Sequence, residues 1–149
     1  MASTTVQIAD AIVRALNGQV FSRPFHAVRA YVPVYELKDM ETLHVTVVPA
    51  EFTGEPSDRA RDREDHAVHV CVQQRFRQGA TGVPVEWIDA LLGICEDIRD
   101  FLRDTELDLT PPLKARRVKT ENKPIYDPKH LAEYGQFTGL MAFTYRVVR

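Results

Sequence analysis

The chain has 149 residues, with 19 lysines and arginines against 21 aspartates and glutamates, a formal net charge of −2. Its length predicts a single domain over residues 1–149, with a core large enough to fold without disulfides or metals. The charge balance argues against a protein that binds nucleic acid mainly through phosphate contacts.

The start of the chain and its apolar runs indicate where the protein folds. The first ten residues, MASTTVQIAD, lack the basic and apolar regions of a signal peptide. No apolar run approaches the roughly 18 residues of a membrane span. Cys71 and Cys95 both lie in apolar runs, as buried free thiols do. We therefore expect folding in a reducing cytoplasm and no membrane association.

The first third of the chain predicts a helix followed by two strands. Apolar residues recur at helical spacing over residues 4–17, and Asn17-Gly18 provides a stop signal. Apolar and polar side chains then alternate over residues 25–36 and 43–48. Because residues 37–41 are a short turn, we expect these two strands to form a hairpin.

The middle of the chain predicts a loop, a strand and a long helix. Residues 51–65 hold six acids and three arginines, which predicts a long solvated loop. Within it we expect residues 55–65 to be mobile, because they lack large apolar side chains. Valines alternate over residues 67–72 as in a strand, and residues 84–103 carry a continuous helical apolar stripe.

The remaining segments complete a predicted α-β-β-β-α-β-β order. A basic strand is expected over residues 113–120, a second long loop over residues 122–135, and a final strand over residues 137–148. The fold class is therefore α+β, an antiparallel sheet with two helices packed on one face. The side chains expected to meet between the second helix and the last strand are Trp87, Leu91, Ile98, Phe101, Phe143 and Tyr145.

Histidines offer one catalytic alternative. His44-Val-Thr46-Val has the H-x-T-x form of the two-histidine phosphoesterases, in which two such motifs face one cleft as general base and general acid. The second motif would be built on His69, but Cys71 replaces its hydroxyl and the spacing is short. A metal site using His66 is disfavoured, because it points to the sheet face opposite His69 and Cys71. We therefore expect no enzyme activity, no metal and no cofactor.

Charge is segregated late in the chain. The end of the second helix and the residues after it are acidic, whereas residues 114–123 are basic. Opposed charge blocks on one small domain suit a heterologous contact between identical subunits, which can close into a ring.

The whole pattern resembles the tail terminators, or tail completion and neck proteins, of long-tailed phages. The segments that carry the resemblance are ADAIVRALNG, LHVTVVPAEF, DREDHAVHVCVQQRF, VEWIDALLGICEDIRDFL and GQFTGLMAFTYRV. The resemblance implies a ring, hexameric in that family, at the head-proximal end of the tail tube. It also implies contacts with the tail tube protein and the head–tail connector, with DNA passing through the ring without specific binding, in a virion assembled in the host cytoplasm. Another neck or tail-tube protein of the same virion is an open alternative.

The charged segments are the predicted contact surfaces of such a ring. We expect the acidic helix end or the charged loop to lie near a neighbour's basic segment, so that reversing Arg116 and Arg117 to Glu impairs assembly without unfolding. The residues predicted to make subunit or partner contacts are Asp58, Arg59, Arg61, Asp62, Arg63, Glu64, Asp65, Asp100, Asp104, Lys114, Arg116, Arg117, Lys119 and Tyr126.

Overall fold

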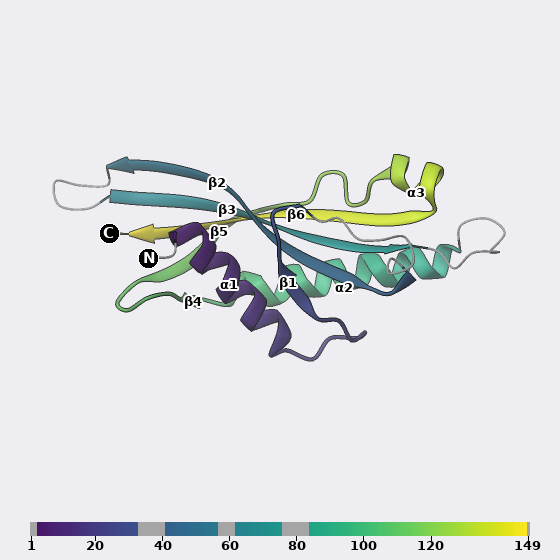
Figure 1. Ribbon diagram of the computed structural model, residues 1–149, viewed down its shortest axis with the longest axis horizontal. Helices are drawn as coiled ribbons and strands as arrows, with labels where there is room; N and C mark the ends of the chain where they lie inside the picture. Colours follow the sequence, from purple (N-terminus) through teal and green to yellow (C-terminus); the bar gives the residue numbers. More distant parts are fainter. Residues whose placement is uncertain (1–2, 33–40, 57–61, 76–83, 149) are drawn as a thin grey trace.

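The computed structural model describes residues 3–32, 41–56, 62–75 and 84–148. In this part of the chain the elements form two main layers, a long twisted sheet and two helices beneath it in the view of Figure 1. The predicted α+β class is confirmed, with both long helices on one face of the sheet.

The two long helices lie where the apolar periodicity places them. Helix α1 (Thr4–Asn17) begins at Ser3, whose hydroxyl accepts a hydrogen bond of 3.1 Å from the backbone N–H of Val6. Helix α2 (Val85–Arg103) follows Pro84 and ends at Asp104. Each helix buries one apolar stripe and leaves its opposite face to solvent.

Among the described residues, six strands form the sheet in the order β1-β2-β3-β6-β5-β4. The pairing is antiparallel except between the first two strands. The strands are β1 (Ala27–Arg29), β2 (His44–Pro56), β3 (Asp62–Arg75), β4 (Leu107–Asp108), β5 (Lys114–Glu121) and β6 (Gln136–Val148). The two-residue β4 is an addition to the predicted order.

The hairpin predicted between residues 25–36 and 43–48 is wrong. Only Ala27–Arg29 of the first segment is a strand among the described residues, and it pairs in parallel with β2, with Ala27 beside Val45. A parallel pair cannot be joined by a tight turn, because the chain must return to the same end of the sheet. Residues 33–40 lie outside the described part.

The solvated loop predicted for residues 51–65 is also wrong where the structure describes it. Residues 51–56 continue β2 and residues 62–65 begin β3, in register from Glu51 beside Ala67 to Pro56 beside Asp62. The expected mobility of residues 55–65 stays a prediction, and residues 57–61 lie outside the described part. Ladder hydrogen bonds involve only the backbone, so charged side chains do not prevent the strands from extending.

The second predicted loop, residues 122–135, contains a short helix, α3 (Pro128–Tyr134). The Asp127 carboxylate caps it by accepting hydrogen bonds of 2.9 and 3.1 Å from the N–H groups of Lys129 and His130. The helix ends at Gly135, whose φ of 60° is left-handed. In Figure 1, α3 lies on the side of the sheet away from α1 and α2.

The core lies between the helices and one face of the sheet. Leu91 and Ile98 of α2 are fully buried, as are Phe143 and Tyr145 of β6. All belong to one apolar cluster, against which Trp87 and Phe101 pack while partly exposed. The predicted contact between α2 and the last strand is therefore confirmed.

Candidate functional site

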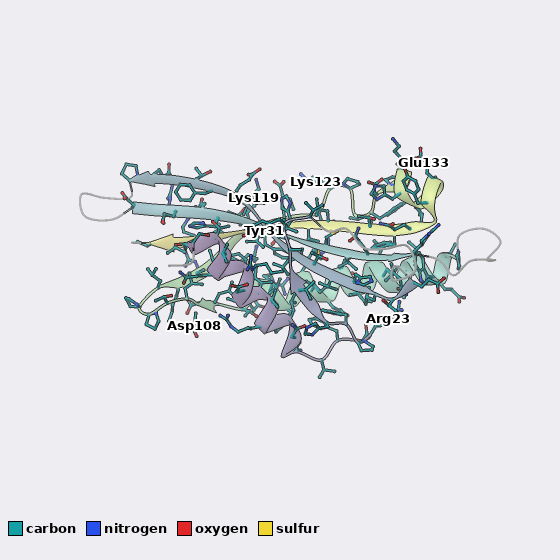
Figure 2. All side chains as sticks on the ribbon, in the orientation of Figure 1. Arg23, Tyr31, Asp108, Lys119, Lys123 and Glu133 are labelled. Atoms are coloured by element: carbon teal, nitrogen blue, oxygen red, sulfur yellow. The ribbon has the colours of Figure 1, made fainter. Side chains whose placement is uncertain are left out.

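The sheet has a helix-covered face and an outer face, and the pairing register shows to which face each side chain points. Valines 68, 70 and 72 of β3 point toward the helices and are buried, whereas His69 and Cys71 point to the opposite, outer face. Figure 2 places Lys119 and Lys123 on this outer side, together with Glu133 of α3, while Asp108 and Arg23 lie on the helix side. A surface contact can therefore be assigned to one face or the other.

The ends of β2 and β3 form an arm, residues 51–56 and 62–65, that reaches past the helix layer in Figure 1. Its base is fixed to α1, because Thr5 Oγ1 and His66 Nδ1 share a hydrogen bond of 2.7 Å. His66 is buried and its ring lies 5.2 Å from that of Phe52, centroid to centroid. Beyond His66, the arm has no helix beneath it among the described residues.

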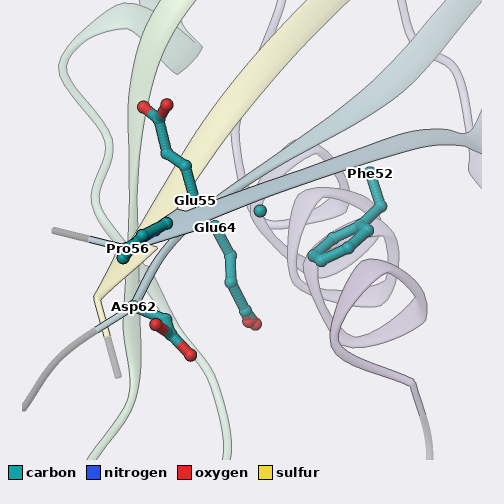
Figure 3. A pocket seen from close by; sticks show the side chains of 6 residues that line it. Phe52, Glu55, Pro56, Asp62 and Glu64 are labelled. Carbon is teal, nitrogen blue, oxygen red and sulfur yellow. The ribbon is translucent and has the colours of Figure 1, made fainter.

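The helix-side surface of the arm is hollow and partly apolar. Phe52 is 60% exposed, and its ring lies across Gly54, where a Cβ atom would stand only 2.9 Å from the ring carbon Cζ. Figure 3 shows Phe52, Asp62 and Glu64 pointing to this side and Glu55 to the other. The hollow has a volume of about 410 Å³. We call this surface the arm hollow.

Ion pairs hold the arm on its other side. Arg63 pairs with Glu55 directly across the hairpin. Asp65 lies opposite Arg146 of β6, whose guanidinium donates two hydrogen bonds of 2.9 and 3.1 Å to the carboxylate. Two of the predicted contact residues, Arg63 and Asp65, thus stabilise their own subunit.

Asp65→Asn is expected to destabilise the protein by about 1 kcal/mol near neutral pH. The Arg146 guanidinium holds the pKa of Asp65 below its usual range. A lowered pKa in the folded state gives stability that is present above the unfolded pKa of about 3.9 and lost as the pH falls through the folded value. Urea unfolding at pH 7 and at pH 3 should show a smaller effect in acid, and an equal effect at both pH values would contradict this assignment.

The basic strand β5 divides its charges between the two faces. Arg116 and Lys119 pair with Arg146 and Thr144, which places them on the outer face. Arg117 instead lies opposite the buried Tyr145, and its guanidinium donates a hydrogen bond of 3.1 Å to Thr120. Reversal of Arg117 to Glu would place a carboxylate in a half-buried position, so we expect it to destabilise the fold and do not use it to test assembly.

The acidic end of α2 and the start of β5 interact within one subunit. Lys114 lies 3.5 Å from Glu106 and 3.7 Å from Asp108. Arg103 lies 3.5 Å from Asp100 and 3.7 Å from Asp104, all exposed. The opposed charge blocks therefore neutralise each other in part at this end of the molecule.

Three predicted contact residues, Asp58, Arg59 and Arg61, lie outside the described residues.

Tyr126, predicted as a contact with another subunit or partner, packs within its own subunit. Its ring stacks on Phe137 at a centroid distance of 6.4 Å and packs against the core cluster. The aromatic residue thus attaches its own segment to the sheet.

A second hollow lies on the outer face beside α3. The segment before α3 follows the edge of β6, where the Asp127 N–H donates a 2.9 Å hydrogen bond to the Thr138 carbonyl. Between this segment and the sheet is a cavity of about 410 Å³ with mainly apolar walls. Its lining includes Val32, Cys71, Lys123, Pro124, His130 and Leu140. We call it the α3 groove.

The two-histidine alternative fails on geometry. His69 pairs with Val48, so His44 stands four residues further along the neighbouring strand. Both side chains share the outer face, but at about 3.4 Å per residue they are roughly 13 Å apart, too far to act on one phosphate. Among residues 3–32, 41–56, 62–75 and 84–148, no group of three His, Cys, Asp or Glu side chains is placed to hold a metal ion.

The cysteines are expected to be inert in the folded protein. Burial raises the pKa of both Cys71 and Cys95 to about 12. At pH 8 we expect neither thiol to react with iodoacetamide, and both to react in urea. Because the folded pKa is raised, the thiols contribute stability that is present below about pH 8.5 and lost as the pH rises toward 12. Rapid labelling of the native protein at pH 8 would contradict this burial.

Comparison with known proteins places the fold. No protein-family model matches the chain, and no curated protein matches it. A chain from the structure "Virion of native gene transfer agent (GTA) particle" is similar over 100% of both chains, with a TM-score of 0.63 and 15% sequence identity. The likeness covers the whole arrangement of helices and strands. At this identity it establishes a shared fold.

Sequence reasoning missed the two hollows. Phe52 lies in a charged segment whose composition predicts a loop, and Leu140 is one apolar residue in an alternating strand. The available signal was the continuous β-compatible run from residue 43 to Phe52, which has no turn residue other than Pro49.

Among the described residues, no helix is both long and apolar enough to span a bilayer.

Proposed function

We propose that this chain is a structural virion protein that closes the head-proximal end of a tail tube. In this role six copies form a ring that stops tube polymerisation and presents a surface to the head–tail connector. DNA passes through the ring without specific binding. The observation that carries the proposal is the full-length likeness in fold to a chain of a virion particle, in a sequence that resembles the tail terminators.

The shape and surface of the subunit support an assembly role. The arm extends beyond the helix layer and exposes an aromatic side chain, and the outer face of the sheet has the open α3 groove. Exposed apolar surface bordered by charge is typical of protein–protein contacts. The sheet also ends at short strands, β1 on one side and β4 on the other, which limits edge-to-edge association.

The decisive experiment is to assemble virions in cells that lack this chain. Without a terminator, tube growth is not stopped, so electron microscopy should show overlong tails of variable length beside tail-free heads. Supplying the chain from a plasmid should restore joined particles of uniform length. Tails of normal length that fail only to attach to heads would place the chain at another level of the neck, and absent tubes would make it a tube component.

A further inference from the structure

We propose that neighbouring subunits of the ring meet through the arm of one copy, which lies on the α3 groove of the next. The occupant of the groove is thus a second copy of this chain. The inference rests on the proposed function, since it assigns the contact that closes the ring. Four properties of the two surfaces carry it: exposure, separation, orientation and charge.

The arm hollow offers an anchor that its own subunit does not cover. Phe52 is 60% exposed although it is large and apolar. The ladder from Phe52 beside His66 to Pro56 beside Asp62 makes the arm a regular extension of the sheet. A preordered strand pair with its aromatic ring laid against Gly54 loses little freedom on binding.

The α3 groove offers an apolar site of matching size. Leu140 is 44% exposed and Val32 is 64% exposed. Cys71, which pairs with Leu140 in the ladder, is buried and also lines the groove. A cavity of about 410 Å³ falls in the range that accepts a bulky side chain together with its neighbours. Aromatic anchors in such pockets contribute most of the affinity at interfaces.

The two surfaces cannot meet within one subunit. Arg63 in the arm and Cys71 in the groove lie on the same continuous strand, β3, and are eight residues apart. At about 3.4 Å per residue they are separated by roughly 27 Å. If the arm and the α3 groove meet, they therefore belong to two different copies of the chain.

The directions of the two surfaces suit an overlapping ring. The arm hollow opens on the helix side of the sheet, whereas the α3 groove opens on the outer side. When one copy is displaced along the sheet by about this separation, its arm lies above the outer face of the next copy. The contact joins different patches on identical subunits, so it is heterologous, and such contacts close into rings.

The charges beside the two surfaces are opposite. Asp62 and Glu64 line the arm hollow and point to its side of the arm, whereas Glu55 points to the other side and pairs with Arg63. The α3 groove includes Lys123, while Lys119, on the same side of the sheet, pairs with Glu121 at 2.7 Å. The groove carboxylate of Asp127 is already engaged by two backbone N–H groups at the start of α3. Complementary charge of this kind fixes the orientation of the contact.

Cysteine cross-linking in the full chain tests the contact. Phe52→Cys and Leu140→Cys are made separately, mixed in equal amounts and treated with a short bis-maleimide. The native Cys71 and Cys95 are buried and should not react. We expect efficient dimers in the mixture and few in either variant alone, because the contact joins unlike patches. Val20→Cys, at a position that is 91% exposed, replaces Phe52→Cys in the control mixture and should give no dimer.

The Phe52→Asp variant provides an independent measurement. We expect it to weaken subunit association by at least roughly tenfold in sedimentation experiments, as loss of an anchor does, while circular dichroism stays unchanged. Rings that form without a 52–140 cross-link, or that survive Phe52→Asp, would overturn this contact and leave the proposed function standing. A third outcome is that tails are overlong without the chain, and that Phe52→Asp abolishes tail binding but leaves subunit association unchanged. This outcome would assign the arm to the tube or connector instead. A chain that never associates and whose loss leaves tails normal would overturn both.

Discussion

Leu91→Ala is expected to lower the free energy of unfolding by about 2–5 kcal/mol. Leu91 is fully buried in the middle of α2, where it belongs to the cluster that joins the helix to β6. Truncation removes apolar contacts and leaves a cavity, because fully buried neighbours such as Phe143 and Ile98 cannot close the space. Urea unfolding at one low protein concentration measures the effect without a contribution from association.

Val85→Ala is the matched control for Leu91→Ala. Val85 lies in the first turn of the same helix and is 70% exposed, so its truncation should change stability by no more than about 0.5 kcal/mol. An equal, small effect of both substitutions would show that α2 does not pack on the sheet through Leu91.

The helices and the inner face of the sheet could be predicted because periodicity reports burial directly. The stripe of α2 and the alternating residues of β6 each bury one side, and the structure places these sides together. Burial of apolar area dominates the energy of such contacts, so the pattern of apolar residues contains the information.

The arm could not be predicted in the same way. Its residues are paired through the backbone and through Arg63 with Glu55, so it lacks the apolar alternation that marks a half-buried strand. The parallel position of β1 was missed for a related reason. Three residues beside β2 carry no signal of strand direction, and a short turn favours an antiparallel pair whenever one is possible.

Helix α3 was missed although its signals are present in the sequence. Asp127-Pro128 is a strong helix start and Gly135 a strong stop. The intervening seven residues bury no side chain fully, so they lack the apolar stripe used to identify the longer helices. Local capping, rather than core burial, defines this element.

The sequence predicts charged surfaces but not how their charges are distributed over the two faces of the sheet. Segregated charge drew attention to β5 and to the charged segment that forms the arm, and their role as contact surfaces stays a prediction. Sequence could not show that Lys114 pairs with Glu106 inside the subunit, nor that Arg117 faces inward. Such assignments depend on register, and a shift of one residue exchanges the two faces of a strand.

Reversal of Arg116 and Lys119 to Glu is expected to impair ring formation and tail completion while leaving the fold intact. Both residues lie on the outer face, and both are exposed. Lys119 loses its ion pair with Glu121, but this pair is exposed and contributes little to stability. Arg116 stands opposite Arg146, so a glutamate there replaces a repulsive cross-strand pair with an attractive one. Arg117 is kept because its side chain faces Tyr145.

The expected loss follows from the acidic arm that this face would meet in a neighbour. Charges at the edge of a contact act mainly on orientation and association rate, so the defect should be largest at low salt. The wild-type ring should itself weaken with salt, since the screening length falls from about 10 Å at 0.1 M to about 3 Å at 1 M. Arg14→Glu with Arg103→Glu changes the net charge equally, but on exposed positions of the two helices. If both variants lose assembly to the same extent, net charge rather than the outer face governs association. If the outer-face variant assembles normally, the contact assigned to this face is wrong.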